Sequence, residues 1–206
     1  MSKEKHAEEI SKLSSVISDS VLRSTIDVIL NNEDFFNFPA STHMHHAYVG
    51  GLATHTIEVT QTAGALCLMH PKADKDIVMT AALWHDFAKI WEYNLVVYFK
   101  SFDKDKPFGD LPRRHVLVES HEAYKKIYQA NFEYKDRIHH VSGSMAEFTT
   151  AATVRGVNRS KIQAVQHAIL AHHGRKDWGT VKEPQTIEAW ILHTADYSSA
   201  HYGVTK

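Results

Sequence analysis

The chain has 206 residues, 43% of them hydrophobic and 23% charged, and its formal net charge is −1. This composition is typical of a globular protein with a proper core rather than a disordered chain, and the near-zero charge excludes long-range capture of duplex nucleic acid. A single cysteine excludes a disulfide framework, and without an apolar run of about 18 residues or a signal-type leader we expect a cytoplasmic protein that does not span a membrane.

The pattern of apolar residues along the chain is mainly helical. Residues at roughly helical spacing predict, in chain order, helices over residues 2–30, 52–69, 75–90, 113–130, 146–155, 159–172 and 186–200. Residues 35–40 form an aromatic connector, and the β-prone and turn-rich residues between the third and fourth helix predict a short β-hairpin around 93–109. We therefore expect an all-α bundle over 41–206, with residues 1–40 packed on it.

Histidine is the compositional anomaly. Sixteen histidines are more than chance surface placement requires, and they gather into clusters that recur at about one per expected helix. The clustered residues with metal-ligand chemistry are His55, His85, Asp86, His115, His172, His173 and Asp196. This arrangement points to a bound metal.

The densest cluster is Leu83-Trp84-His85-Asp86-Phe87-Ala88-Lys89, inside the helix expected over 75–90. Neighbouring side chains on a helix diverge by about 100°. An ion between them can therefore take the imidazole of His85 from one side and the carboxylate of Asp86 from the other; alternatively, Asp86 bridges two ions. Lys89 follows three residues after Asp86 and is expected to project toward the same pocket, where an ammonium can grip a phosphate.

The other clustered residues each have a second interpretation when taken singly. His55 follows Gly50-Gly51, where a backbone or ligand can come close, but it could be a packed core histidine. His172-His173-Gly174 ends a helix, and these histidines could instead complement the helix macrodipole. Asp196 could be a solvated helix acid. It is the recurrence of such residues on separate helices that favours metal binding.

The chemistry of these groups limits which metal ions they can bind. They offer nitrogen and oxygen but no sulfur, which suits Mn, Fe, Zn, Mg, Co or Ni. Five or more histidines with two aspartates exceed what one tetrahedral zinc ion needs. The surplus favours two ions about 3.5–4 Å apart, the arrangement that activates water against phosphate esters. We expect one or two divalent metal ions as the cofactor.

The motif His55, His85-Asp86 and Asp196, with Lys89 after the pair, resembles that of the HD-domain superfamily of metal-dependent phosphohydrolases over roughly residues 43–201. Two stretches, His45-His46-Ala47-Tyr48-Val49-Gly50-Gly51-Leu52-Ala53-Thr54-His55 and Ala171-His172-His173-Gly174-Arg175-Lys176-Asp177-Trp178-Gly179, are similar to the HD domain of bacterial 3′→5′ exoribonucleases, which an OB-fold module precedes. The resemblance implies an all-α HD-domain bundle with a mono- or dinuclear site.

The resemblance also implies roles for single residues. The core ligands are His55, His85, Asp86 and Asp196, and the extra ligands of the dinuclear variety are His115, His172 and His173. Lys89 contacts phosphate or water, and His115 or His173 protonates the leaving oxygen. Arg113-Arg114 could be a solvated helix start or a phosphate clamp beside the metal. Tyr48 and Trp178 could be core aromatics or a base-stacking platform.

We therefore expect an enzyme that cleaves a phosphate ester of a nucleotide, cyclic dinucleotide or short oligonucleotide with a metal-activated water, a phosphodiester in preference. Residues 1–40 are too short and too helical for an OB-fold, which disfavours processive degradation of RNA. Their amphipathic helix is expected to pack on the domain or to form a homodimer contact. Neither duplex nucleic acid nor a membrane is an expected partner.

Three other interpretations stay open. The same ligand types can house a di-iron oxygenase, or a sensor that binds metal and nucleotide without turnover. The third is a structural helical protein whose histidines acquire metal only during purification. The last is disfavoured because the ligands fall on separate expected helices, in the order of the family.

Overall fold

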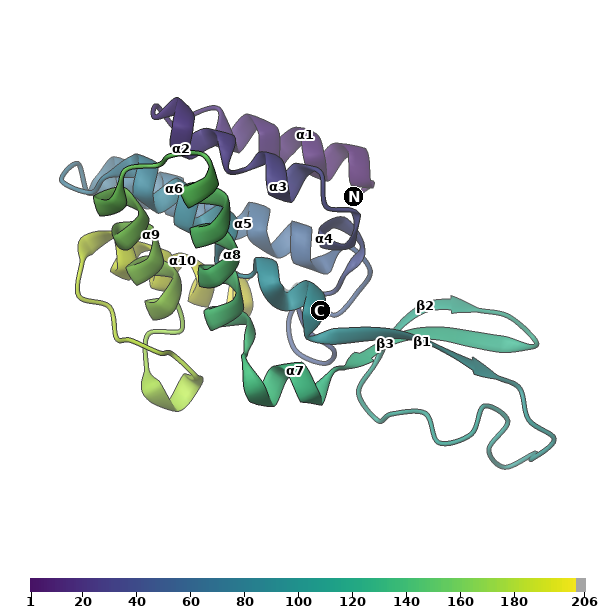
Figure 1. Cartoon of the computed structure of the whole chain (residues 1–206). Helices are drawn as coiled ribbons and strands as arrows, with labels where there is room; N and C mark the ends of the chain where they lie inside the picture. The colour runs from purple at the N-terminus through teal and green to yellow at the C-terminus, as the bar shows by residue number, and fades with distance from the viewer. Residues whose placement is uncertain (203–206) are drawn as a thin grey trace.

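The computed structural model in Figure 1 describes residues 1–202, which form a helical body with a projecting β-arm. The α-helices are α1 (Lys3–Ser14), α2 (Ser20–Ser24), α3 (Asp27–Leu30), α4 (Glu33–Asn37), α5 (Gly51–Met69), α6 (Lys75–Trp84), α7 (Phe132–Arg137), α8 (His140–Val154), α9 (Arg159–Ala171) and α10 (Ile187–Tyr202). The 3-10 helices are η1 (Phe87–Trp91) and η2 (Lys176–Trp178), and the strands are β1 (Tyr93–Phe99), β2 (Val116–Ser120) and β3 (Tyr124–Ala130). The predicted all-α class is confirmed, with one small sheet added.

Helix α6 forms the centre of the body. Every residue from Ile77 to Trp84 is buried, as expected of a helix that is hydrophobic on all sides. The helices α1, α2, α5, α8, α9 and α10 pack around it. The Trp84 indole donates a hydrogen bond to the Thr25 hydroxyl at 3.2 Å, which satisfies the polar edge of the ring inside the core. Among the described residues, no helix combines the length and apolar character needed to cross a membrane.

The N-terminal region differs from the single helix expected over 2–30. It forms α1, α2 and α3, and α4 lies in the segment expected as a connector. The break has a local cause: the Asp19 carboxylate accepts hydrogen bonds from the Val21 and Leu22 amides, and the Asp76 carboxylate accepts from the Ser18 and Asp19 amides. A carboxylate that bonds the backbone favours a helix start over a helix interior.

The helix expected over 75–90 also ends early. Helix α6 stops at Trp84, Asp86 leaves the helical conformation with φ −112° and ψ 7°, and η1 begins at Phe87. His85 and Asp86 therefore stand at a turn between two short elements. At such a turn two consecutive side chains can face the same point.

The arm is an antiparallel sheet of strand order β1-β3-β2 that stands away from the body in Figure 1. Strand β1 lies where the hairpin was expected, but it pairs with β3, from Tyr93 with Ala130 to Phe99 with Tyr124. The helix expected over 113–130 is wrong, because this segment forms β2 and β3. It is rich in Val, Ile and Tyr, which suit a pleated surface, and pairing over such distances leaves no trace in local spacing.

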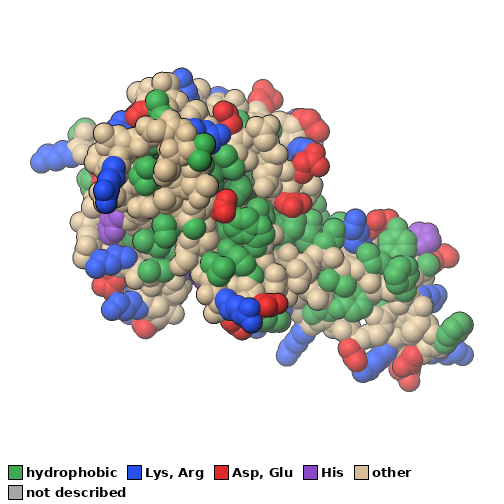
Figure 2. Space-filling view, viewed as in Figure 1, with side chains coloured by type: hydrophobic (Ala, Val, Ile, Leu, Met, Phe, Trp, Pro, Cys, Tyr) green, Lys and Arg blue, Asp and Glu red, His purple; other side chains and the backbone are tan. Residues whose placement is uncertain are grey.

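One face of the arm carries exposed hydrophobic side chains. Leu95, Val97 and Phe99 alternate along β1 and are each at least 41% exposed. The space-filling view in Figure 2 shows hydrophobic side chains along the arm and where it joins the body. The arm thus contributes little to the core that positions the site described next.

Candidate metal centre

Two helices and the turn after α6 bring the first group of predicted ligands together. His55 comes from α5, His85 and Asp86 from the turn, and Asp196 from α10. His55 Nε2 lies 3.3 Å from His85 Nε2, 3.4 Å from Asp86 Oδ2 and 3.1 Å from Asp196 Oδ1. His85 Nε2 is also 3.4 Å from Asp86 Oδ2. Four side chains from remote parts of the sequence thus direct their ligand atoms at one point.

A second group faces the other oxygen of Asp86. His140, at the start of α8, places Nε2 at 3.3 Å from Asp86 Oδ1, and His172, at the end of α9, places Nε2 at 3.7 Å from it. His173 Nε2 lies 3.2 Å from His140 Nε2. Asp86 therefore stands between two sets of imidazoles, with one carboxylate oxygen toward each.

Hydrogen bonds from Nδ1, the ring nitrogen that faces away from the centre, fix the orientation of the histidines. In four of them Nδ1 donates a hydrogen bond that leaves Nε2 facing the centre: His55 to Ser199 Oγ (2.9 Å), His85 to Ala82 O (2.7 Å), His140 to Glu92 Oε1 (2.8 Å) and His172 to Ile169 O (2.7 Å). The Ser199 hydroxyl in turn donates to Glu58 Oε2 at 2.8 Å. Outer hydrogen bonds of this kind set the tautomer and the angle of metal-binding histidines.

Two buried atoms at the centre require a partner from outside the protein. Asp86 Oδ1 and His172 Nε2 are buried and have no hydrogen-bond partner among the described residues. An unsatisfied buried polar group costs about 1–3 kcal/mol, and more when it is charged. A divalent cation satisfies both atoms at once. The residues present therefore fit a metal ion.

The charges around Asp86 maintain its ligand form. Burial would raise the pKa of Asp86, but the Lys89 ammonium and the neighbouring His85 and His140 lower it well below its usual range. Lys89 Nζ lies 2.7 Å from Asp86 Oδ2. Burial would lower the pKa of Lys89, yet the Asp86 charge raises it. Both groups of this pair are therefore charged at neutral pH.

His172 and His173 are held in the neutral form that binds metal. Burial is the largest cause, and it lowers the pKa of His172 well below its usual value and that of His173 to about 4. Neutral imidazole is the form that coordinates a cation. Glu92, behind His140, stays ionised: burial would raise its pKa, but the charge of His140 and its hydrogen bond lower it to about 2.

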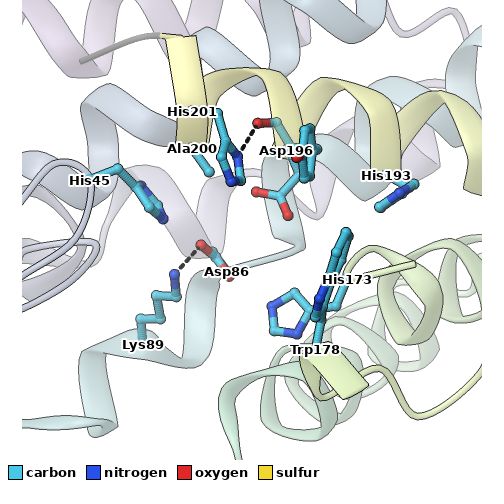
Figure 3. Close-up of a pocket in the computed structure, with 10 residues that line it drawn as sticks. His45, Asp86, Lys89, His173, Trp178, His193, Asp196, Ala200 and His201 are labelled. Atoms are coloured by element: carbon cyan, nitrogen blue, oxygen red, sulfur yellow. Dashed lines mark hydrogen bonds and ion pairs between the residues drawn. The ribbon is translucent and has the colours of Figure 1, made fainter. Parts of the chain in front are cut away.

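A cavity of about 370 Å³ opens onto this centre (Figure 3). Asp86, Lys89 and Asp196 line it, and in Figure 3 the Lys89 side chain points at Asp86. Trp178 and Tyr197 lie in its wall with their rings stacked at 5.6 Å. Trp178 is 46% exposed and Tyr197 39% exposed, so their ring surfaces are accessible. The cavity thus joins a cluster of ligands to an aromatic wall.

Two glycines let the backbone come close enough to build the site. Gly174 has φ +79°, and a Cβ there would collide with the ring of His193, whose Nδ1 donates to the His172 carbonyl at 2.8 Å. A Cβ on Gly51 would collide with the His46 carbonyl. These glycines allow α10 to cover the His172 turn and the loop before α5 to lie beside His55.

The structure does not bring every predicted site residue to the centre. His115 precedes β2, bonds the Pro112 carbonyl through Nδ1, and belongs to none of the groups of metal-ligand type among the described residues. Arg113 and Arg114 line a different cavity, and Tyr48 does not line the cavity of the centre. For Arg113, Arg114 and His115 the cause is the wrongly predicted helix over 113–130, since these residues end the connection that leads into β2 of the arm.

His140 is the ligand-type residue that the sequence did not single out. It lies in residues 132–156, the least predictable part of the sequence, where a pair such as His139-His140 is by default a structural or surface feature. A signal was present, because this pair begins a helix as His172-His173 ends one. From the sequence, His43, His45 and His46 are expected mainly to pack or to support the ligands from behind, with substrate contact by one of them as the alternative. In the structure His45 lines the cavity, and His46 Nε2 lies 3.2 Å from Glu58 Oε2.

The part of the chain that contains these residues is similar to known proteins. The family model of the HD domain matches residues 52–201. The 3′-5′ exoribonuclease YhaM of Geobacillus sp. (strain WCH70) is 28% identical over 164 residues, which are 80% of this chain and 41% of that protein. Those of Bacillus pumilus (strain SAFR-032) and Bacillus subtilis (strain 168) are each 27% identical, over 80% and 79% of this chain and 43% and 42% of theirs.

The chain spans less than half of the length of these relatives. No solved structure matches it. The family match covers most of the chain and contains both ligand groups around Asp86. The resemblance found in the sequence is thereby confirmed: this chain belongs to the HD domain family.

Proposed function

We propose that this chain is a metal-dependent phosphohydrolase that cleaves a phosphodiester of a nucleotide, cyclic dinucleotide or short oligonucleotide. The observation that carries the proposal is the position of Asp86, whose two carboxylate oxygens face separate groups of imidazole nitrogens. A shared carboxylate between two ligand groups is the arrangement that a pair of divalent ions requires.

The residues that would hold the ions fall into two sets. One set is His55, His85, Asp86 and Asp196, and the other is Asp86, His140, His172 and His173. Their nitrogen and oxygen donors suit Mn, Fe, Ni, Co, Mg or Zn. Divalent ions there supply the positive charge that activates a water molecule and stabilises a phosphate ester under attack.

Lys89 acts on the substrate directly in this proposal. Its ammonium lines the cavity and lies 2.7 Å from Asp86. Since Lys89 is only 7% exposed, its charge is poorly screened by water. A phosphate oxygen that enters the cavity meets a fixed positive charge, which favours the more charged transition state over the ground state.

A proton donor to the leaving oxygen must lie within hydrogen-bond reach of the substrate. His173 lines the cavity, but it is held neutral and stands among the proposed metal ligands, so it is not retained as that donor. His115 is not retained either, since it lies before β2 and outside the cavity. No hydroxyl or thiol nucleophile is required, because water is the attacking group.

The aromatic wall supports a nucleotide as the substrate. Trp178 and Tyr197 stack with an interplanar angle of 19° and present accessible ring surface beside the phosphate site. Stacking on such a surface stabilises the binding of a base by about 1–3 kcal/mol, whichever base it is. The relatives named as exoribonucleases are consistent with a nucleic-acid substrate.

The proposal is tested by a hydrolysis screen. Protein loaded with Mn²⁺ is incubated with a chromogenic monoester, a chromogenic diester, nucleotides, cyclic dinucleotides and short RNA. Asp86→Asn, which keeps the shape of the side chain, is compared with Asp105→Asn on the exposed loop of the arm. We expect turnover of a diester that Asp86→Asn abolishes and Asp105→Asn retains.

The screen also separates the alternatives. Turnover that survives Asp86→Asn contradicts the proposed site. Silence on all esters, with two ions still bound per chain, contradicts the proposed activity and favours the oxygenase or the sensor. A redox-active iron pair with a visible absorption band would then identify the oxygenase.

A further inference from the structure

A second cavity, of about 470 Å³, lies where the arm joins the body, and we name it the arm-base cavity. Five segments line it: the loop before α5, β1, the end of the long connection between β1 and β2, the end of β3, and α7. Their side chains include Arg113, Arg114, Lys135 and Phe132. In Figure 1 this region lies between α7 and the lower loop of the arm.

The arm-base cavity carries positive charge that the protein does not neutralise. Arg113, Arg114 and Lys135 are exposed, and within residues 1–202 none of them has a carboxylate within 4.0 Å. Asp110, the acidic residue in its lining, is paired with Lys106. Three cations beside one neutralised acid form a site for an anion, and two adjacent guanidinium groups suit phosphate oxygens.

The positive field extends to the neighbouring loop. Burial lowers the pKa of His43, and the charges of Arg114 and Lys135 lower it further. His43 lines the arm-base cavity together with these residues. The cations therefore act on a common space, although they come from separate segments.

The arm-base cavity also has an aromatic surface. Phe132, the first residue of α7, lines it and is 68% exposed. The Tyr98 hydroxyl donates to Gln129 Oε1 at 2.8 Å, so its ring is held in the wall. Cations alternating with exposed rings are the combination by which proteins bind single-stranded nucleic acid without sequence preference.

A single short loop separates the arm-base cavity from the metal centre. Thr42 and His43 line the first, and His45 lines the cavity of the centre. Two residues of extended chain span at most about 7 Å, so the Cα atoms of His43 and His45 are no farther apart. A flexible polyanion with one end at the metal centre can therefore reach the arm-base cavity within a few repeating units.

We propose that the arm-base cavity binds the phosphodiester backbone of a single-stranded oligonucleotide whose end lies at the metal centre. The proposal rests on the proposed function for its choice of ligand. Arg113, Arg114 and Lys135 bind successive phosphates, and Phe132 stacks against a base. The arm thereby extends the substrate site beyond the cavity of the metal centre.

The test measures binding without turnover. A single-stranded RNA of about eight nucleotides, within the length that such sites cover, carries a fluorescein label and is titrated with the full chain in EDTA while anisotropy is followed. We compare Arg113→Gln/Arg114→Gln with Lys72→Gln/Lys75→Gln, which removes two exposed cations, one in the loop after α5 and one at the start of α6. Circular dichroism establishes that both variants are folded.

We expect the arginine variant to bind at least about tenfold more weakly, and the slope of log K against log salt to fall by about 1.4, since each phosphate contact on a single strand contributes about 0.7. The lysine variant is expected to bind as the wild type does. Equal affinity and salt slope in the arginine variant and the wild type would overturn the proposal. So would wild-type protein that does not bind the RNA, or an equal loss in the lysine variant.

Kinetics separate this proposal from the proposed function. With active protein, the loss of kcat/KM in Arg113→Gln/Arg114→Gln should grow with oligonucleotide length. A loss that is the same for all lengths overturns the arm-base cavity as a second site while leaving the hydrolase intact. If the arginine variant binds RNA more weakly but the wild type hydrolyses no ester, the result supports RNA binding at the arm-base cavity and contradicts the proposed hydrolase activity.

Discussion

The metal centre and the arm-base cavity both gather charged side chains, but they hold them in opposite ways. In the metal centre Asp86 is 1% exposed, pairs with the buried Lys89 at 2.7 Å, and lies among histidines fixed through Nδ1. In the arm-base cavity Arg113 and Arg114 are exposed, and neither pairs with a carboxylate of the described residues. The first arrangement is pre-organised for small ions, and the second can adapt to a flexible chain.

The difference sets how each region responds to substitution. Removing one member of a buried, paired cluster leaves another charge unpaired in a medium of low dielectric constant, and the cost is large. Removing one exposed cation costs about 1 kcal/mol or less, because water and salt already screen it. We therefore expect large, specific losses at the centre and small, nearly additive ones at the periphery.

The largest effect is expected from His140→Ala, compared with His115→Ala. His140 Nε2 lies 3.3 Å from Asp86 Oδ1, whereas His115 lies before β2 in the arm. Removing a metal ligand should lower activity more than removing a residue that only hydrogen-bonds to a ligand. We therefore expect His140→Ala to lower kcat by about 100-fold or more and to reduce the amount of bound metal. Mass spectrometry of the native protein and diester kinetics measure both effects.

His115→Ala should retain its metal and lose less than about tenfold in kcat, since no metal-ligand contact is removed. If His115→Ala instead lost more kcat and more bound metal than His140→Ala, His115 would be a metal ligand. That result would contradict the conclusion that the ligands come from the helical body and not from the arm.

A smaller effect is expected one contact farther out, from Glu92→Gln. Glu92 Oε1 accepts from His140 Nδ1 at 2.8 Å and from the His140 amide at 2.9 Å. The amide oxygen of glutamine can still accept, but without its charge the imidazole becomes a weaker ligand. Metal affinity should fall about 10- to 100-fold, as measured by competition with a chromogenic chelator.

Glu133→Gln is the matched control for Glu92→Gln. Glu133 pairs with Arg137 on the surface of α7, with side chains at least 73% exposed. Its replacement should leave metal affinity unchanged. If Glu92→Gln binds metal as the wild type does, the hydrogen bond rather than the charge of Glu92 is what orients His140.

The aromatic wall should give a loss in substrate binding alone. Trp178→Ala removes a ring that lines the cavity, and KM for a dinucleotide should rise about tenfold with kcat little changed, since stacking is worth about 1–3 kcal/mol. An abasic analogue should show no such rise. Trp190→Ala removes a ring that is 53% exposed on α10 but does not line the cavity. An equal rise in KM for both variants would contradict the proposed stacking of the substrate base on Trp178 in the aromatic wall.

The sequence predicted the helical body and much of the metal centre because both depend on local patterns. Helices α5, α9 and α10 lie within a few residues of their predicted bounds. His55, His85, Asp86 and Asp196 are brought together, as the family order implied. The arm was not predicted because β1 pairs with β3 across a long connection, and no local period records that pairing.

His140 was overlooked for a different reason. The residues shortly after it, Ser142-Gly143-Ser144, have low helix propensity, and they make 132–156 the least predictable segment of the sequence. In the structure they lie within α8, and a Cβ on Gly143 would collide with Ala88 and Tyr134. The Ser144 hydroxyl accepts from the Ala88 amide at 3.0 Å. Small residues here permit close packing of α8 on η1, a tertiary requirement that overrides local propensity.

The smallest effect is expected at a partly exposed ion pair in the body, where Lys161 Nζ lies 2.7 Å from Asp19 Oδ2 and joins α9 to the start of α2. The hydrogen bond from Lys161, followed by that from the Leu22 amide, lowers the pKa of Asp19. A lowered folded-state pKa contributes stability that is present above the unfolded pKa and is lost as pH falls through the folded value.

Lys161→Met should therefore lower the free energy of unfolding by at most about 0.5 kcal/mol at neutral pH, because solvent screens the pair. The difference from the wild type should decline once pH falls below the usual pKa of Asp19, near 3.8, and vanish as pH falls through its lowered folded-state pKa. Urea unfolding at neutral and acidic pH measures it, with Asp19→Asn/Lys161→Met closing the double-mutant cycle. A coupling of several kcal/mol, or one that survives acid, would mean that this partly exposed pair behaves like the buried Asp86–Lys89 pair, and the contrast between fixed and screened charges would no longer hold.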